Sequence, residues 1–199
     1  MHALGQVASV RLHASIEPAT LARALNAVLP TDVRVAAAEV MPDDFHARFS
    51  ATGKIYDYRI VNAPFASPFL RHSVWHVIAR LRQDAMREAA VALVGEHDFA
   101  AFQGTGSDVH TSVRTVRRID WQGSGGAEDP LIMQIEGNGF LRHMVRNIVG
   151  TLADIGLGRW PAGGIEAILA SRDRARAGTT APASGLVLRE VLYSHKIAR

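Results

Sequence analysis

The chain has 199 residues, of which 48% are hydrophobic and 21% are charged, and its net charge is +3. No apolar run is long enough to span a bilayer and cysteine is absent, which excludes disulfides, thiolate zinc sites and cysteine nucleophiles and favours a soluble, cytoplasmic protein. Arginine supplies 20 of the 22 basic residues, which suits phosphate and base contacts in RNA, although a GC-rich genome produces the same bias.

The N-terminal part of the chain predicts strands and one helix. Alternating apolar residues over 4–12 indicate an opening strand, and residues 18–29, which begin with a proline, have helical spacing. Two further strands are predicted over 33–40 and 47–61, the second rich in β-forming residues. A proline-broken loop over 63–71 and a short strand over 72–78 precede a helix over 83–94, which ends at Gly95.

The C-terminal part continues with the same kinds of element. Strands are predicted over 114–121 and 131–135 around a turn at 123–126, followed by helices over 142–155 and 163–170. A polar loop over 171–183 leads to a closing strand over 185–193. Interleaved strands, hairpins and helices predict an α+β fold, with two ferredoxin-like halves that share one antiparallel sheet.

A pair of histidines and a strand with interleaved cations and tyrosines are the first candidate sites for metal or RNA binding. His72 and His76 are four residues apart, but the residues between them are β-like and no carboxylate cluster accompanies them, so we predict no metal site. In the strand over 47–61, Arg48 and Lys54 share a face with Tyr56 and Tyr58. Interleaved cations and rings suit single-stranded RNA, but the residues alone favour ordinary packing of both tyrosines.

The stretch GNGFLRHMVRNIVGTL, residues 137–152, contains the most unusual cation of the chain. As a helix it buries Met144, Ile148 and Leu152 on one stripe, which places Arg146 and Asn147 among apolar residues. A buried guanidinium is costly unless it meets a carboxylate or a phosphate. The sequence therefore predicts an anionic partner for Arg146.

Seven blocks of sequence, taken in order, resemble the tRNA pseudouridine synthase A family across essentially the whole chain. They are HALGQV, FHARFSATGKIYDYRI, SPFLRHSVWH, LVGEHDFAAF, SVRTVRRID, GFLRHMVRNIVGTL and SRDRARAGTTAPASGL. The resemblance implies a cofactor-free homodimer that isomerises uridine to pseudouridine in the anticodon stem-loop of tRNA. It also implies two ferredoxin-like halves, with residues 1–82 as the remainder of an incomplete N-terminal half and residues 83–199 as the C-terminal half.

The resemblance assigns roles to individual residues. Tyr56 matches the tyrosine that packs against the target base, and Arg146 matches the arginine that pairs with the catalytic carboxylate. Leu186 matches an apolar residue of the pocket, and Arg48 remains a candidate contact for RNA. With these matches, the interpretation of Tyr56 as a stacking residue becomes stronger than that of simple packing.

The family's catalytic aspartate belongs to a Gly-Arg-Thr-Asp-Ala-Gly-Val-His-Ala motif, of which only His2 and Ala3 are found here. Met1 takes the place of the valine, so the resemblance predicts a front end without its first strand, a helix and the catalytic loop. A valine codon read as the start of the gene would explain this, as would a decayed gene or a non-catalytic RNA-binding fragment. Asp57, Asp98 and Asp108 are not expected to replace the aspartate.

Overall fold

The computed structural model describes residues 1–106 and 109–194 and has a mixed α+β fold with one open, mostly antiparallel sheet. The chain divides into two compact units. The larger unit consists of Met1–Gln6 and Gly53–Val191, and the smaller one consists of Val7–Thr52 and the residues from Leu192 onward.

The sheet is made of seven strands in the order β1-β7-β2-β6-β5-β4, with β3 paired to β2 outside this path. Strand β1 runs parallel to β7 and β3 parallel to β2, whereas the pairs β2/β6, β6/β5 and β5/β4 are antiparallel. The strands are β1 (His2–Ala3), β2 (Ala51–Val61), β3 (Trp75–His76), β4 (Gly95–Asp98), β5 (Val113–Gln122), β6 (Leu131–Gly137) and β7 (Leu186–Tyr193).

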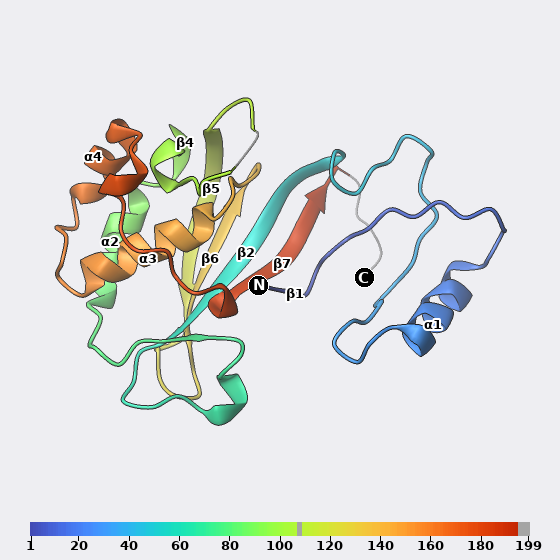
Figure 1. The fold of residues 1–199 in the computed structure, drawn as a ribbon, viewed down its shortest axis with the longest axis horizontal. Helices are drawn as coiled ribbons and strands as arrows, with labels where there is room; N and C mark the ends of the chain where they lie inside the picture. Colours follow the sequence, from blue (N-terminus) through green and yellow to red (C-terminus); the bar gives the residue numbers. More distant parts are fainter. Residues whose placement is uncertain (107–108, 195–199) are drawn as a thin grey trace. The chain divides into compact units, whose positions relative to one another are not determined.

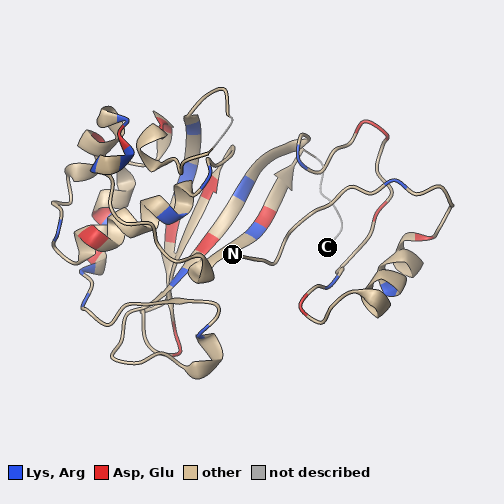
Figure 2. Ribbon diagram, in the orientation of Figure 1, with Lys and Arg blue, Asp and Glu red and all other residues tan. Residues whose placement is uncertain are grey.

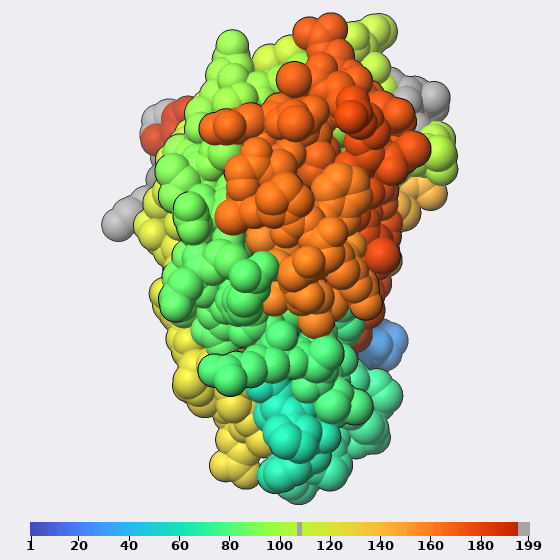
Figure 3. All heavy atoms as spheres, turned by 90° about the vertical axis from the view of Figure 1, so that its left-hand side faces the viewer, coloured from blue at the N-terminus to red at the C-terminus, as the bar shows by residue number. Residues whose placement is uncertain are grey.

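One face of this sheet is covered by three helices, α2 (Gln83–Val91), α3 (Met144–Gly156) and α4 (Gly164–Ser171). Figure 3 looks directly at this helical layer. The core lies between helices and sheet and includes Tyr58, Ile60, Met133, Ile135, Ile148 and Leu152. Because side chains alternate along a strand, Tyr56 and Tyr58 of β2 lie on the helical side, and Asp57 lies on the other.

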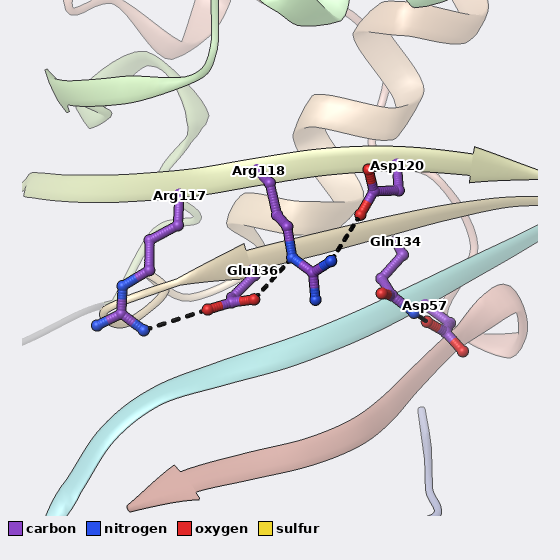
Figure 4. Close-up of polar contacts among 6 residues, drawn as sticks. All are labelled: Asp57, Arg117, Arg118, Asp120, Gln134 and Glu136. Atoms are coloured by element: carbon purple, nitrogen blue, oxygen red, sulfur yellow. Dashed lines mark hydrogen bonds and ion pairs between the residues drawn. The ribbon is translucent and has the colours of Figure 1, made fainter. Parts of the chain in front are cut away.

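The opposite face of the sheet carries paired charges (Figure 4), and Figure 2 shows that basic and acidic residues occur on neighbouring strands of the sheet. Glu136 forms ion pairs with Arg117 at 3.4 Å and with Arg118 at 2.8 Å, and Arg118 also reaches Asp120 at 3.1 Å. Asp57, 1% exposed, accepts a hydrogen bond from Gln134 at 3.0 Å. The basic groups named here are therefore already neutralised by their neighbours.

The smaller unit contains α1 (Pro18–Val28), which confirms the predicted helix over 18–29. The carboxylate of Glu17 caps this helix by accepting from the Thr20 N–H at 2.9 Å. The strands predicted over 4–12 and 33–40 are wrong, because these segments are irregular and Leu4, Val10 and Val40 are exposed. An alternating pattern becomes a strand only beside a partner strand, and the sheet provides one only for His2–Ala3.

The other predicted helices and strands of the larger unit are found within a few residues of the expected bounds, and β4 was not predicted. The strand expected over 47–61 begins only at Ala51, so Arg48 lies in a turn and not on the strand of Tyr56. In the described part of the chain, no helix combines the length and the apolar character needed to cross a bilayer.

Candidate functional site

Two tyrosines of β2 form one wall of the candidate site. The half-buried ring of Tyr56 meets Phe140 edge-on, with 5.2 Å between ring centroids. Tyr58 is fully buried, and its hydroxyl donates to the carbonyl of Pro182 at 2.7 Å. Burial raises the pKa of both tyrosines, and the charge of Arg146 acts in the opposite direction on the pKa of Tyr58. The charge of Arg146 thus favours the ionised form of Tyr58, whereas burial opposes it.

Arg146 lies near the start of α3 and is tied to the residue that precedes Pro182. Its Nε donates to the carbonyl of Ala181 at 2.7 Å, and the Ala181 N–H donates back to the Arg146 carbonyl at 3.1 Å. Arg146 and Tyr58 thus bind consecutive carbonyls of one segment. The side chain is half-buried, and within residues 1–106 and 109–194 it forms no ion pair. The predicted anionic partner of Arg146 therefore stays a prediction.

Cations gather around His143, which precedes α3. Arg142, Arg146 and Arg174 all lower the pKa of the His143 imidazole, although its burial is the largest cause. Arg142 donates to the Gly106 carbonyl at 2.9 Å, and Arg174 donates to neutral oxygens as well. Because the N-terminal end of a helix is itself positive, this end of α3 favours an anion.

His143 also has a left-handed backbone, with φ 59°, which is unusual for a residue other than glycine. Backbone strain of this kind costs about 1–3 kcal/mol and is concentrated at functional sites. The added Cβ of an alanine at Gly104 would lie 2.8 Å from the His143 ring, so glycine is needed there for the ring to keep its position. The arrangement of His143 is therefore fixed from two sides.

We expect Arg146→Ala to raise the pKa of His143 toward its ordinary value, because one of the three cations that oppose imidazole protonation is removed. The value should stay below the ordinary one, since burial of the ring remains the largest cause of the shift. Titration of the imidazole by NMR measures this, with Arg80→Ala, an exposed arginine, as the control. An unchanged His143 titration would show that Arg146 does not face the imidazole.

Asn147 holds the segment that Arg146 and Tyr58 contact. Its side chain is 1% exposed, and its Oδ1 accepts from Thr180 at 2.7 Å and from Arg174 at 3.1 Å. Its Nδ2 donates to the Phe102 carbonyl at 2.8 Å. The sequence singles out Asn147 as a polar residue in an apolar helix, but its partners are distant in sequence and were missed.

Leu186 closes the site at the start of β7. It is 6% exposed and belongs to the core, and Gly185 before it packs so closely against the Tyr58 ring that a Cβ there would lie 2.8 Å from ring carbons. The register of β1 with β7 pairs His2 with Val187. The start of β1 therefore lies beside the start of β7, next to Leu186.

Arg48 belongs to the smaller unit and is exposed, with its guanidinium 5.5 Å from the centre of the Phe49 ring. Two of the three other acids considered are engaged elsewhere. Asp57 pairs with Arg189 at 3.0 Å on the face of the sheet opposite the tyrosines, as its place in the strand predicts. Asp98 pairs with Arg172 at 3.0 Å, and Asp108 lies outside the described residues.

Comparison with known proteins adds an independent line of evidence. A family model described as tRNA pseudouridine synthase matches residues 89–194. The tRNA pseudouridine synthase A of Acetivibrio thermocellus is 44% identical over 194 residues, which cover 97% of this chain and 78% of that protein. The proteins of the same name from Syntrophotalea carbinolica and Bacillus subtilis are 44% and 42% identical, over 98% of this chain and 76% and 78% of their own lengths.

Proposed function

The chain belongs to the tRNA pseudouridine synthase A family, and we propose that it recognises the anticodon stem-loop of tRNA as a homodimer. The family's reaction is the isomerisation of uridine to pseudouridine in tRNA. The stem-loop and the homodimer are what the family resemblance implies. The observation that supports an active site in this chain is Arg146, a half-buried cation without a carboxylate partner in the described residues, beside the tyrosine wall of β2.

The reaction moves a base on its ribose. The bond from uracil N1 to ribose C1′ breaks, the base turns, and C5 bonds to C1′, while C5 loses a proton and N1 gains one. Atoms and electrons balance, so the isomerisation involves no net redox change. The uridine must first leave its stack, which costs about a few kcal/mol, and stacking on an aromatic ring offsets this. We assign the stacking role to Tyr56, whose ring is already oriented by Phe140.

Arg146 is the residue that we assign to the family's catalytic carboxylate, which it would hold ionised and oriented. The position of β1 supports this assignment. His2 and Ala3, the two residues that the chain shares with the family motif, pair with Val187 and Leu188, next to Leu186 at the start of β7. Leu186 then forms the apolar wall of the base pocket, and Arg48 of the smaller unit is proposed to contact the RNA backbone.

The order of elements supports a ferredoxin-like half within the proposed two-half fold. From β2 to β7 the main elements follow the order β2-α2-β5-β6-α3-β7, the β-α-β-β-α-β sequence of that motif. From the sequence we propose a first half over residues 1–82 and a second half over residues 83–199. The order of elements favours an earlier boundary, because it includes β2 (Ala51–Val61) in the second half. Because the proposed substrate is tRNA, we propose that the protein acts in the cytoplasm.

The resemblance assigns the nucleophile to the family motif, of which these 199 residues contain only His2 and Ala3, and we propose that the 199-residue chain binds tRNA without converting it. The test incubates the purified chain with an unmodified tRNA transcript and measures both affinity and pseudouridine content. As a positive control, a homologous enzyme of the family should convert the same transcript. Pseudouridine formed by this chain would contradict the assignment of the nucleophile.

A second candidate function is that of a non-catalytic, dimeric RNA-binding protein. The same experiment separates the two functions when it is repeated with a form extended to include the family's aspartate. Both functions predict tRNA binding, but only an enzyme predicts that this extended form produces pseudouridine. If a form extended to include the family's aspartate converts the transcript, the enzyme assignment holds. If that form folds and binds tRNA but still gives no product, the binding function is the correct one.

A further inference from the structure

A shallow pocket of about 480 Å³ lies in the larger unit, on the loop that leads into β3. Residues 64–68 form one side, and Arg71, Val74, Trp75, His76 and Ser184 complete it. Its volume is within the range of about 300–1,000 Å³ that is usual for small-ligand sites. None of the roles assigned above uses these residues.

The lining combines exposed aromatic surface with positive charge. Phe65 is 69% exposed, although a phenylalanine gains most when it is covered. The guanidinium of Arg71 is exposed and makes a hydrogen bond to the Pro68 carbonyl at 3.0 Å. Among the residues that the structure describes, no acidic one lines the pocket. Rings that stack on bases and a cation that meets the phosphate are the two features needed to bind a single-stranded nucleotide.

The pocket adjoins the candidate site through two of its own residues. The Trp75 ring stands perpendicular to the Tyr58 ring, with 6.2 Å between their centres, and Tyr58 is part of the wall of that site. Ser184, two residues before Leu186, donates to the Val74 carbonyl at 3.0 Å. Trp75 pairs with Ile60, which is four residues from Tyr56 along β2, or about 13 Å at about 3.3 Å per residue. A strand of RNA with one nucleotide at the candidate site therefore has a nucleotide a few positions away within reach of the pocket.

We propose that this pocket binds a nucleotide a few positions from the target uridine, with its base against Phe65 and its phosphate at Arg71. The inference rests on the proposed function, since it requires an RNA substrate at the Tyr56 site. The positive charge without acidic neighbours favours RNA over a second copy of this chain. Because the surface of Phe65 is open, we expect the pocket to discriminate little between bases.

The test measures the affinity of the 199-residue chain for an unmodified tRNA transcript. Phe65→Ala should weaken binding by about tenfold, because stacking on one ring is lost, and Phe65→Trp should restore it. Phe69→Ala is the matched control: this side chain is 95% exposed on the same loop but does not line the pocket, and its loss should leave affinity unchanged. Arg71→Ala should reduce the slope of log affinity against log salt concentration by about one, which corresponds to one lost phosphate contact. Arg80→Ala should leave this slope unchanged.

Two results would overturn the inference. The first is that Phe65→Ala and Phe69→Ala bind tRNA with equal affinity while the original chain also binds it. This result would rule out the pocket as an RNA site and leave the proposed function intact. The other is a change of oligomeric state in Phe65→Ala at unchanged RNA affinity, which would make the pocket a protein interface. If the original chain fails to bind tRNA at all, both this inference and the proposed function are wrong.

Discussion

Arg146→Ala, in a form of the protein that carries the family's aspartate, should slow the conversion of uridine by roughly 10²–10³-fold. The substitution removes the counter-charge that we propose for the catalytic carboxylate, and breaking a buried ion pair costs about 3–5 kcal/mol. Affinity for tRNA should change far less, because Arg142 and Arg174 remain at the same end of α3. Single-turnover rates and tRNA affinity, measured together, separate the two effects.

Variants at the same positions make this expectation sharper. Arg146→Lys should recover little of the rate, because an ammonium cannot replace the planar donors of a guanidinium that already binds Ala181 through Nε. Tyr56→Phe keeps the stacking ring and should retain binding. If Arg146→Ala instead weakens tRNA binding and leaves the single-turnover rate normal at saturation, Arg146 is a phosphate contact.

The effect of Arg146→Ala on the free energy of unfolding shows whether Arg146 has a structural role. In the described residues Arg146 has one side-chain hydrogen bond and no ion pair, and it lies among other cations. In the 199-residue chain we therefore expect its loss to cost about 1 kcal/mol of unfolding free energy at most. A large effect on the reaction with a small effect on folding is typical of a functional side chain.

The parts of the fold that the sequence predicts well are those that carry their own local signal. Helix α3 has a continuous apolar stripe and β2 a run of β-forming residues, and both contribute buried side chains to one core in the structure. The same reasoning fails for residues 4–12 and 33–40. Their alternation is real, but a strand needs a partner, and partners cannot be deduced from local spacing.

The site follows the same rule. Period-two alternation is enough to separate Asp57 from Tyr56 and Tyr58, and burial of the helix is enough to single out Arg146. The contacts of Arg146 with Ala181, and of Asn147 with Thr180, join α3 to a loop more than thirty residues later. The sequence predicts only a polar loop there, because the contacts depend on how the loop folds back on the helix.

Gly150→Ala tests how closely this loop must approach α3. Alanine is favoured over glycine in a helix by about 0.5–1 kcal/mol, so propensity alone predicts a gain in stability. At Gly150, however, the new Cβ would overlap the carbonyl of Thr179. The backbone of the loop would have to move, and we expect a net loss of about 1–3 kcal/mol of unfolding free energy, measured by urea or thermal unfolding.

Gly164→Ala in α4 is the matched control, because the added Cβ would lie 3.8 Å from the Pro161 ring, which is an ordinary contact. Its stability should be unchanged or slightly higher.

Gly150→Ala should also affect the candidate site. A loop pushed away at Thr179 carries Ala181 with it, so Arg146 loses its Nε acceptor and its orientation. Gly150→Ala should therefore lower tRNA conversion in the form with the aspartate even at temperatures where it is fully folded, whereas Gly164→Ala should not. If Gly150→Ala is as stable and as active as the control, the loop does not depend on this close approach for its position, and the orientation of Arg146 must come from Asn147 and Arg174 alone.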